Sequence, residues 1–221
     1  MLFTAVRDMQ WRRWRFVIAI IVTGLVFAMT LVLTGLANGF RVEDERTVDS
    51  LGVNAFLIKS GATGPFLGSV PFPASELQAI ASAPGVLAAA PLAYKGATFK
   101  NGDSTRDAAV FGAPGGGPGM PAMSLGRPPL GPDEIAVSST IDRQLGDELE
   151  RGSRKLLIVG IVDNSTALAK TPNLFLTTEG VQQLEYGGQP LISSIGISGT
   201  LAHVPDGYRV CLLYTSPSPR D

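Results

Sequence analysis

The hydrophobic pattern of the chain is dominated by residues 16–36, FVIAIIVTGLVFAMTLVLTGL, which contain no charged side chain. A helix rises 1.5 Å per residue, so about twenty residues cross the roughly 30 Å hydrocarbon core of a bilayer. The polar side chains in this stretch are Thr23, Thr30 and Thr34, whose hydroxyls can donate to a carbonyl one turn earlier. The pattern therefore predicts a transmembrane helix.

Two other structures produce apolar stretches of this kind, namely the core helix of a soluble protein and a cleavable signal peptide. A core helix that is apolar on every side would be unusual in a chain of 221 residues. The apolar region of a signal peptide is about 7–15 residues long and ends at an A-x-A-like site. The sequence LANG at 36–39 matches that site poorly, which favours an uncleaved membrane helix.

Charges on either side of the stretch predict its orientation. Residues 1–15 carry four arginines against one acid, Asp8, whereas the acids at 43–45 outnumber Arg41 and Arg46 after it. Because basic residues stay on the cytoplasmic side, we expect a cytoplasmic N-terminus and an extracytoplasmic main domain. Segment 1–15 is expected to form an amphipathic helix on the inner surface. Its predicted membrane-interface anchors are Trp11, Arg12, Arg13, Trp14 and Arg15.

Beyond the membrane helix, charges alternate with apolar residues over 37–53, which predicts an amphipathic stalk. Short apolar runs bounded by glycine and proline then predict strands. The expected strands are 54–59, 86–99 with an interruption at Pro91, 107–113, 134–138, 156–162, 173–177 and 192–197.

Three helices are expected between these strands. The first covers 74–83 and has a Ser75–Gln78 capping box; the second starts at Ser138 and repeats Ile141, Leu145 and Leu149; the third starts at Thr177 or Thr178 and runs to Leu184. The fold class is therefore α+β: one N-terminal transmembrane helix, then a mixed α/β, two-lobed extracytoplasmic domain over 54–210.

Composition narrows the function further. The net charge is −1, and no basic patch lies beyond the membrane-flanking arginines, so nucleic acid is not an expected partner. Cys211 is the single cysteine, which excludes an internal disulfide and a cysteine-based metal site.

Candidate catalytic patterns are absent or weak. No GxxxxGK[ST] phosphate loop occurs, and the glycine-rich run at 112–119 has the composition of a flexible loop that is too rich in glycine and proline to pack. His203, the sole histidine, has Asp206 nearby but no nucleophile elbow, and is expected to be solvated. The acid pairs at 133–134 and 147–148 are expected to be solvated charges at element ends. The sequence thus predicts no catalytic, cofactor or metal residues and no enzyme.

Four segments together resemble the MacB/FtsX-type ABC transporter permeases. They are Trp-Arg-Arg-Trp-Arg at 11–15, the unit from FPASEL at 72–77 to APGV at 83–86, LGRPPL at 125–130 followed by DEIAVSS at 133–139, and LLIVGIV at 156–162 followed by PNLFLT at 172–177. Each motif is loose, and their order carries more information than any one of them.

The resemblance implies a permease subunit with no cofactor and with a MacB-like periplasmic core domain. Its implied partners are the lipid bilayer, a cytoplasmic ABC ATPase subunit, a second permease in a homo- or heterodimer, and a periplasmic accessory protein. The ATPase would hydrolyse ATP, and the stalk would relay movement to the external domain for export or mechanotransmission. The implied location is the bacterial inner membrane.

The sequence departs from the family pattern near its end. The three later membrane helices of such permeases are missing, and the half-unit that begins at 192–197 lacks a helix and a return strand. Residues 211–221, CLLYTSPSPRD, continue no expected element and resemble translated adapter sequence, the alternative being a genuine disordered Ser/Pro tail. We expect an N-terminal fragment with an incomplete core domain. The alternative function is a complete, single-pass membrane-anchored binding or interaction module.

Overall fold

The computed structural model describes residues 13–49, 51–66, 68–101 and 104–212 of the 221-residue chain. Two compact units divide the chain, residues 1–42 and residues 43–221. Helix α2 (Arg13–Asp49) supplies the first unit and continues across the boundary without a break. The expected membrane helix and most of the expected stalk are therefore a single helix. The amphipathic segment predicted at 1–15 lies outside the described residues up to residue 12.

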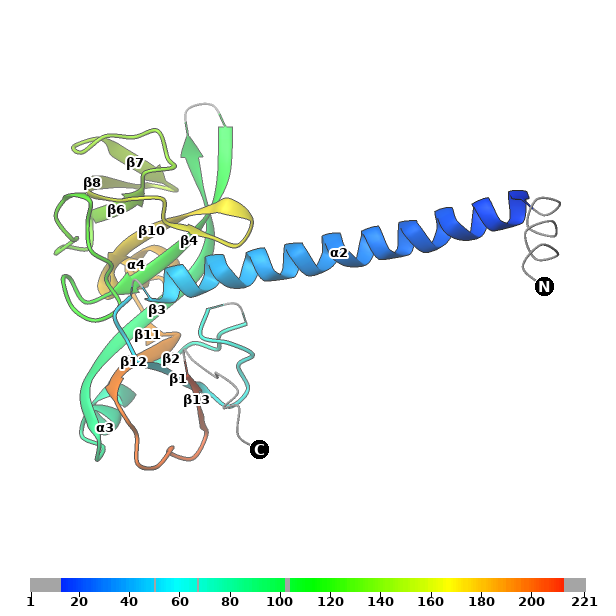
Figure 1. The fold of residues 1–221 in the computed structure, drawn as a ribbon. Coiled ribbons are helices and arrows are strands. Elements are labelled where there is room, and N and C mark those ends of the chain that lie inside the picture. The colour runs from blue at the N-terminus through cyan, green and yellow to red at the C-terminus, as the bar shows by residue number, and fades with distance from the viewer. Residues whose placement is uncertain (1–12, 50, 67, 102–103, 213–221) are drawn as a thin grey trace. The chain divides into compact units, whose positions relative to one another are not determined.

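The second unit is built on one mixed sheet with the strand order β13-β1-β12-β3-β4-β10-β6-β8-β5 (Figure 1). Strand β7 pairs with β8, β9 pairs with β10, and β11 forms a separate pair with β2. The strands are β1 (Ala55–Lys59), β2 (Phe72–Pro73), β3 (Val86–Asn101), β4 (Ser104–Ala113), β5 (Leu125–Gly126), β6 (Glu134–Ser138), β7 (Glu148–Arg151), β8 (Arg154–Val162), β9 (Thr166–Ala167), β10 (Thr171–Thr177), β11 (Leu191–Ile192), β12 (Ser194–Gly199) and β13 (Tyr208–Leu212).

Strand β3 joins the two lobes of this unit. Its first half, up to Leu92, pairs with β12, and its second half, from Ala93 onward, pairs with β4. We call β1, β12, β13 and the first half of β3 the first lobe. The second lobe consists of the second half of β3 with β4, β5, β6, β7, β8 and β10. The second lobe is continuous in sequence and is inserted between two separated parts of the first.

The predicted interruption of this strand at Pro91 is wrong. Pro91 lies within β3, opposite Ile195 of β12, and pairing with β4 begins only at Ala93. A proline removes one N–H donor from a ladder, and here it falls where β3 changes partner. Ser193 stabilises the same point, because its hydroxyl accepts from the Tyr94 N–H at 2.8 Å and donates to the Leu92 carbonyl at 3.4 Å.

In the first lobe, β1 and β3 both pair antiparallel with β12, which lies between them. The 3-10 turn η1 (Ala74–Glu76) and helix α3 (Leu77–Ala81) connect β1 to β3, so the expected strand–helix–strand unit exists in a split form. Strand β12 continues to β13 on the far side of β1. A return strand, which was expected to be missing, is therefore present as β13, although the connection over 200–207 contains no helix.

Two further expectations about the first lobe need correction. The Ser75–Gln78 capping box does not form, because the turn begins after Pro73 with no side-chain cap. The first two residues of the segment 211–221 were expected to continue no element but lie in β13, where Cys211 pairs with Phe56 and Leu212 pairs with Ala55; the foreign origin of this segment stays a prediction. Residues 213–221 lie outside the described residues.

The second lobe follows its predicted elements closely. Strand β6 has the predicted bounds, and β4, β8 and β10 contain the predicted strands. Helix α4 (Thr178–Glu185) starts as expected, since the Thr177 hydroxyl accepts from the Gly180 N–H at 3.0 Å. Burial alternates along most of β8, with Leu156 fully buried and Leu157 44% exposed, so this strand is covered less evenly than its apolar sequence suggests.

The helix predicted from Ser138 to Leu149 is wrong. After β6 the Ser138 hydroxyl accepts from the Thr140 N–H at 3.3 Å, and the chain turns without forming a helix. Gly146 has φ +89° and its N–H donates to the Ile158 carbonyl, while Leu149 lies in β7. Contacts with β8 thus replace the local helix that the four-residue spacing favoured.

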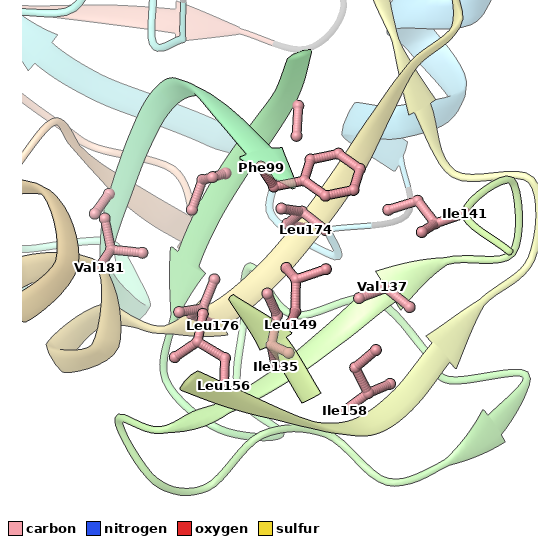
Figure 2. Packing of buried hydrophobic residues seen from close by; sticks show 13 residues of the cluster. Phe99, Ile135, Val137, Ile141, Leu149, Leu156, Ile158, Leu174, Leu176 and Val181 are labelled. Atoms are coloured by element: carbon pink, nitrogen blue, oxygen red, sulfur yellow. The ribbon is translucent and has the colours of Figure 1, made fainter. Parts of the chain in front are cut away.

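Three apolar clusters hold the unit together. The cluster in Figure 2 fills the second lobe beneath α4 and includes Phe99, Leu156, Leu174 and Val181. A second cluster lies on the other face of the sheet and joins both lobes through Phe56, Leu92, Phe111 and Phe175. The third packs Ile80 of α3 against Leu57, Ile195 and Ile197.

Candidate functional site: a membrane span and an external domain

Residues Arg13–Gly39 of α2 form a segment long and apolar enough to cross a membrane. The side chains of this segment are exposed, as a lipid-facing helix requires. The hydroxyl of Thr30 donates to the Val26 carbonyl at 2.9 Å, and that of Thr34 donates to the Thr30 carbonyl at 2.8 Å. These bonds satisfy the hydroxyls within the helix, which removes most of the cost of placing them in lipid.

The predicted membrane-interface anchors are only partly described. Arg13, Trp14 and Arg15 form the first turn of α2 and are exposed, with Trp14 72% exposed. Trp11 and Arg12 lie outside the described residues. The anchoring role of all five side chains therefore stays a prediction.

Candidate catalytic groups are not brought together. His203 is exposed on the connection between β12 and β13, as expected, with Asp206 also exposed. Within the described part of the chain, no three His, Cys, Asp or Glu side chains lie close enough together to hold a metal ion. Cys211 is half-buried in β13.

The acid pairs expected to be solvated are instead engaged. Glu134 accepts from Arg127 in a two-point ion pair, with one N–O distance of 2.8 Å, and also from the Leu130 and Gly131 N–H groups. The Arg127 hydrogen bond, followed by the Leu130 N–H, lowers the pKa of Glu134 to about 2. This set of bonds to Glu134 was not predicted from the sequence. The two prolines between Arg127 and Leu130, which restrict the backbone, are the one local signal that could have indicated it.

The other acids also find partners. Asp147 accepts from the Gln144 N–H at 2.9 Å, Glu148 pairs with Lys155 at 2.9 Å, and Asp133 pairs with Arg154. Asp133 and Glu148 remain more than half exposed, as expected for solvated side chains. Contrary to the expectation, each also forms an ion pair.

The glycine-rich run after β4 packs, contrary to its expected role as a flexible loop. Gly119 donates to the Leu51 carbonyl at 2.7 Å, and Met120 is buried in the cluster that joins the lobes. Gly119 has φ +92°, and a Cβ there would lie 2.2 Å from Leu92 Cδ2. Glycine is favoured here because this positive φ is strained for any residue with a Cβ, and a Cβ would also displace the Leu92 side chain.

Known proteins resemble this chain in sequence and in fold. No family model matches the chain. It is 66% identical over 209 residues to uncharacterised ABC transporter permeases of Mycobacterium tuberculosis and Mycobacterium bovis, and 63% identical to a second such permease of M. tuberculosis. Each match covers 95% of this chain and 60% of the relative. The chain thus spans less than two thirds of their length.

Two solved structures share the fold of the external domain at low sequence identity. The periplasmic region of MacB from Actinobacillus actinomycetemcomitans aligns with a TM-score of 0.53 at 13% identity, covering 75% of this chain and 92% of that one. The extracellular domain of the noncanonic ABC-type transporter YknZ from Gram-positive bacteria aligns with a TM-score of 0.51 at 12% identity, covering 72% and 100%. The chain is therefore similar, over nearly all of its length, to part of these ABC transporter permeases, and its α/β domain has the fold of the MacB periplasmic region.

Proposed function

We propose that this chain forms part of a permease subunit whose helix α2 links a cytoplasmic ATPase to the external α/β domain. ATP hydrolysis belongs to the partner, since this chain has no phosphate-binding loop. The N-terminus is cytoplasmic, and the external domain moves during export or mechanotransmission. The subunit works as a dimer with itself or a sister permease, and the external domain acts on a substrate or an accessory protein.

The observation that carries this proposal is the continuity of α2. The candidate span ends at Gly39, yet the helix continues to Asp49, and Leu51 just after it is buried in the cluster that joins both lobes. A helix with intact backbone hydrogen bonds moves as a rigid element. In the proposed mechanism, a displacement of the membrane span is passed along α2 toward the external domain.

Orientation is tested by labelling single cysteines. Cys211 is replaced by serine, and Ser82, an exposed residue after α3, is replaced by cysteine. A membrane-impermeant maleimide should label Ser82→Cys in intact cells, while a tag at the N-terminus should resist external protease until the membrane is opened. Labelling of Ser82→Cys only after the membrane is opened would reverse the proposed orientation.

Coupling is tested by kinking α2 just beyond the span. Val42→Pro removes a helix hydrogen bond and bends the helix, and Val42→Ala is the matched control. In the full-length permease with its ATPase, nucleotide should alter hydrogen exchange in the first lobe of the wild type and the control but not of Val42→Pro. If nucleotide does not change hydrogen exchange in the external domain of the wild type, the proposed coupling through α2 is disproved. The alternative function, a single-pass binding module, is then favoured.

A further inference from the structure

A polar hollow of about 650 Å³ lies at the end of the second lobe, away from the membrane span in sequence. Three elements line it: the paired ends of β3 and β4, the β7–β8 hairpin turn, and α4. Its floor is apolar, because Phe99 and Leu184 belong to the core cluster of this lobe (Figure 2 shows Phe99). Such a volume is within the range of sites for small molecules.

Positive charge predominates among the side chains of this hollow. Lys100, Arg151 and Arg154 line it, and Glu150 is the one carboxylate in the lining. Hydroxyl and amide groups complete the polar wall: Thr98, Thr105, Ser153 and Gln183. A lining of this kind offers many hydrogen-bond donors and few negative charges.

The two arginines are held in place by ion pairs with acidic residues that are not part of the lining. Arg151 pairs with Glu185 at 2.6 Å and also donates to the Thr98 carbonyl. The side chains of Arg151 and Glu185 are 19% and 8% exposed, so this pair is largely buried. Arg154 pairs with Asp133. A guanidinium has five N–H donors, so each arginine keeps donors for a ligand while its position is fixed.

Lys100 differs from the arginines. It is exposed and makes no ion pair among the described residues. Glu150 is partly neutralised by Lys155 at 3.8 Å. An anion in the hollow would therefore meet one cation that has no ion pair among the described residues and two fixed donor groups, with Glu150 as the carboxylate in the described lining that opposes it.

From this arrangement we propose that the hollow binds a small soluble molecule bearing an oxyanion, either a carboxylate or a phosphate. Lys100 supplies the attraction, and Arg151 and Arg154 supply directional hydrogen bonds. The apolar floor at Phe99 and Leu184 accepts the carbon skeleton of the ligand. This site is separate from the membrane span and does not depend on the orientation of α2.

Calorimetric titration of the whole chain in detergent micelles tests the site, with citrate and inorganic phosphate as probes. Lys100→Met should weaken binding roughly tenfold, which is the scale of one charged hydrogen bond. Glu150→Gln should tighten it about threefold, because the opposing charge is removed. Lys95→Met is the matched control, since Lys95 is exposed on the same strand but outside the lining.

Each outcome decides the proposal. A loss at Lys100→Met, a gain at Glu150→Gln and less than a twofold change at Lys95→Met support it. The stronger probe, citrate or phosphate, identifies which oxyanion the site prefers. Equal weakening by both lysine variants would show general surface attraction and overturn the site, as would the absence of binding by either probe to the wild type at low ionic strength.

Discussion

The two lobes of the external domain share one strand but are assembled in different ways. The second lobe is built from consecutive residues, so β4, β6, β8 and β10 find their neighbours within one stretch of chain. The first lobe brings Ala55 of β1 next to Ile197 of β12 and Leu212 of β13. Its sheet closes only after the whole second lobe has been inserted, which carries a larger loop-closure cost.

We therefore expect the apolar cluster that both lobes share to couple their stabilities. Phe111 and Phe175 stack with ring centres 5.5 Å apart, and Phe66 contacts Phe56, Tyr94 and Phe111. Phe56 comes from the first lobe, and Phe111 and Phe175 come from the second. Removing a shared ring should therefore weaken both lobes, whereas changes elsewhere should remain local.

The largest effect is expected for Phe175→Ala. Phe175 is fully buried, and truncating a buried phenylalanine costs about 3–5 kcal/mol through lost burial and the cavity that remains. Hydrogen exchange should show lost protection in β1 and β12 as well as in β6 and β10. Leu156→Ala, within the second-lobe cluster alone, is the comparison; equal loss in the first lobe for both variants would contradict a special role for the shared cluster.

A smaller effect is expected at the junction in β3. Ser193→Ala removes the acceptor of the half-buried Tyr94 N–H and should cost about 0.5–1.5 kcal/mol, the scale of one lost hydrogen bond. Ser194 is equally buried, and its hydroxyl makes no hydrogen bond among the described residues, so Ser194→Ala should be neutral or stabilising. Urea unfolding followed by circular dichroism compares the two. Tryptophan fluorescence is unsuitable, because both tryptophans precede residue 16. If the two variants are equally stable, the hydroxyl of Ser193 contributes nothing to the junction.

The smallest effect concerns pH and the second lobe alone. The folded-state pKa of Glu134 is about 2, below the value near 4.3 of an unfolded glutamate. Its stabilising contribution is therefore complete above about pH 4.3 and is lost as the pH falls toward 2. Because Arg127 is about half exposed, solvent screens the ion pair and keeps this contribution small.

The matched variant for this prediction is Glu134→Gln. It should lower stability at pH 7 and flatten the pH dependence between about 4 and 2. Thermal unfolding across that range, compared with the wild type, measures both. An unchanged pH slope would mean that the Arg127–Glu134 pair does not stabilise the lobe.

Several elements could be predicted from local sequence because their causes are local. The apolar run of α2, the cap at Thr177 and the strand at Glu134–Ser138 depend on neighbouring residues, and each was predicted correctly. The helix at 138–149 failed because Ile141 and Leu149 are buried by contacts with other strands, while Leu145 is 44% exposed. A spacing of four residues cannot distinguish burial along one face of a helix from burial by contacts with distant strands.

Of the candidate site, the sequence indicated the span and the absence of catalytic motifs but not the cation-lined hollow. Arg151 and Arg154 share the β7–β8 hairpin, whereas Lys100 lies far from them in sequence, and only the packing of that hairpin beside β3 places all three around one volume. The same reasoning applies to the ion pair between Arg151 and Glu185, whose members lie 34 residues apart. No local pattern marks such a pair.

The sequence by itself determined that the chain has a membrane-length apolar helix, charged flanks and a following mixed α/β domain, since composition and periodicity act over a few residues. Only the tertiary structure decided that β3 runs unbroken through Pro91, that Gly119 of the glycine-rich run packs against Leu92, and that β13 pairs with β1 in the first lobe. These features depend on partners far away in the chain, whose burial and hydrogen bonds outweigh local propensity.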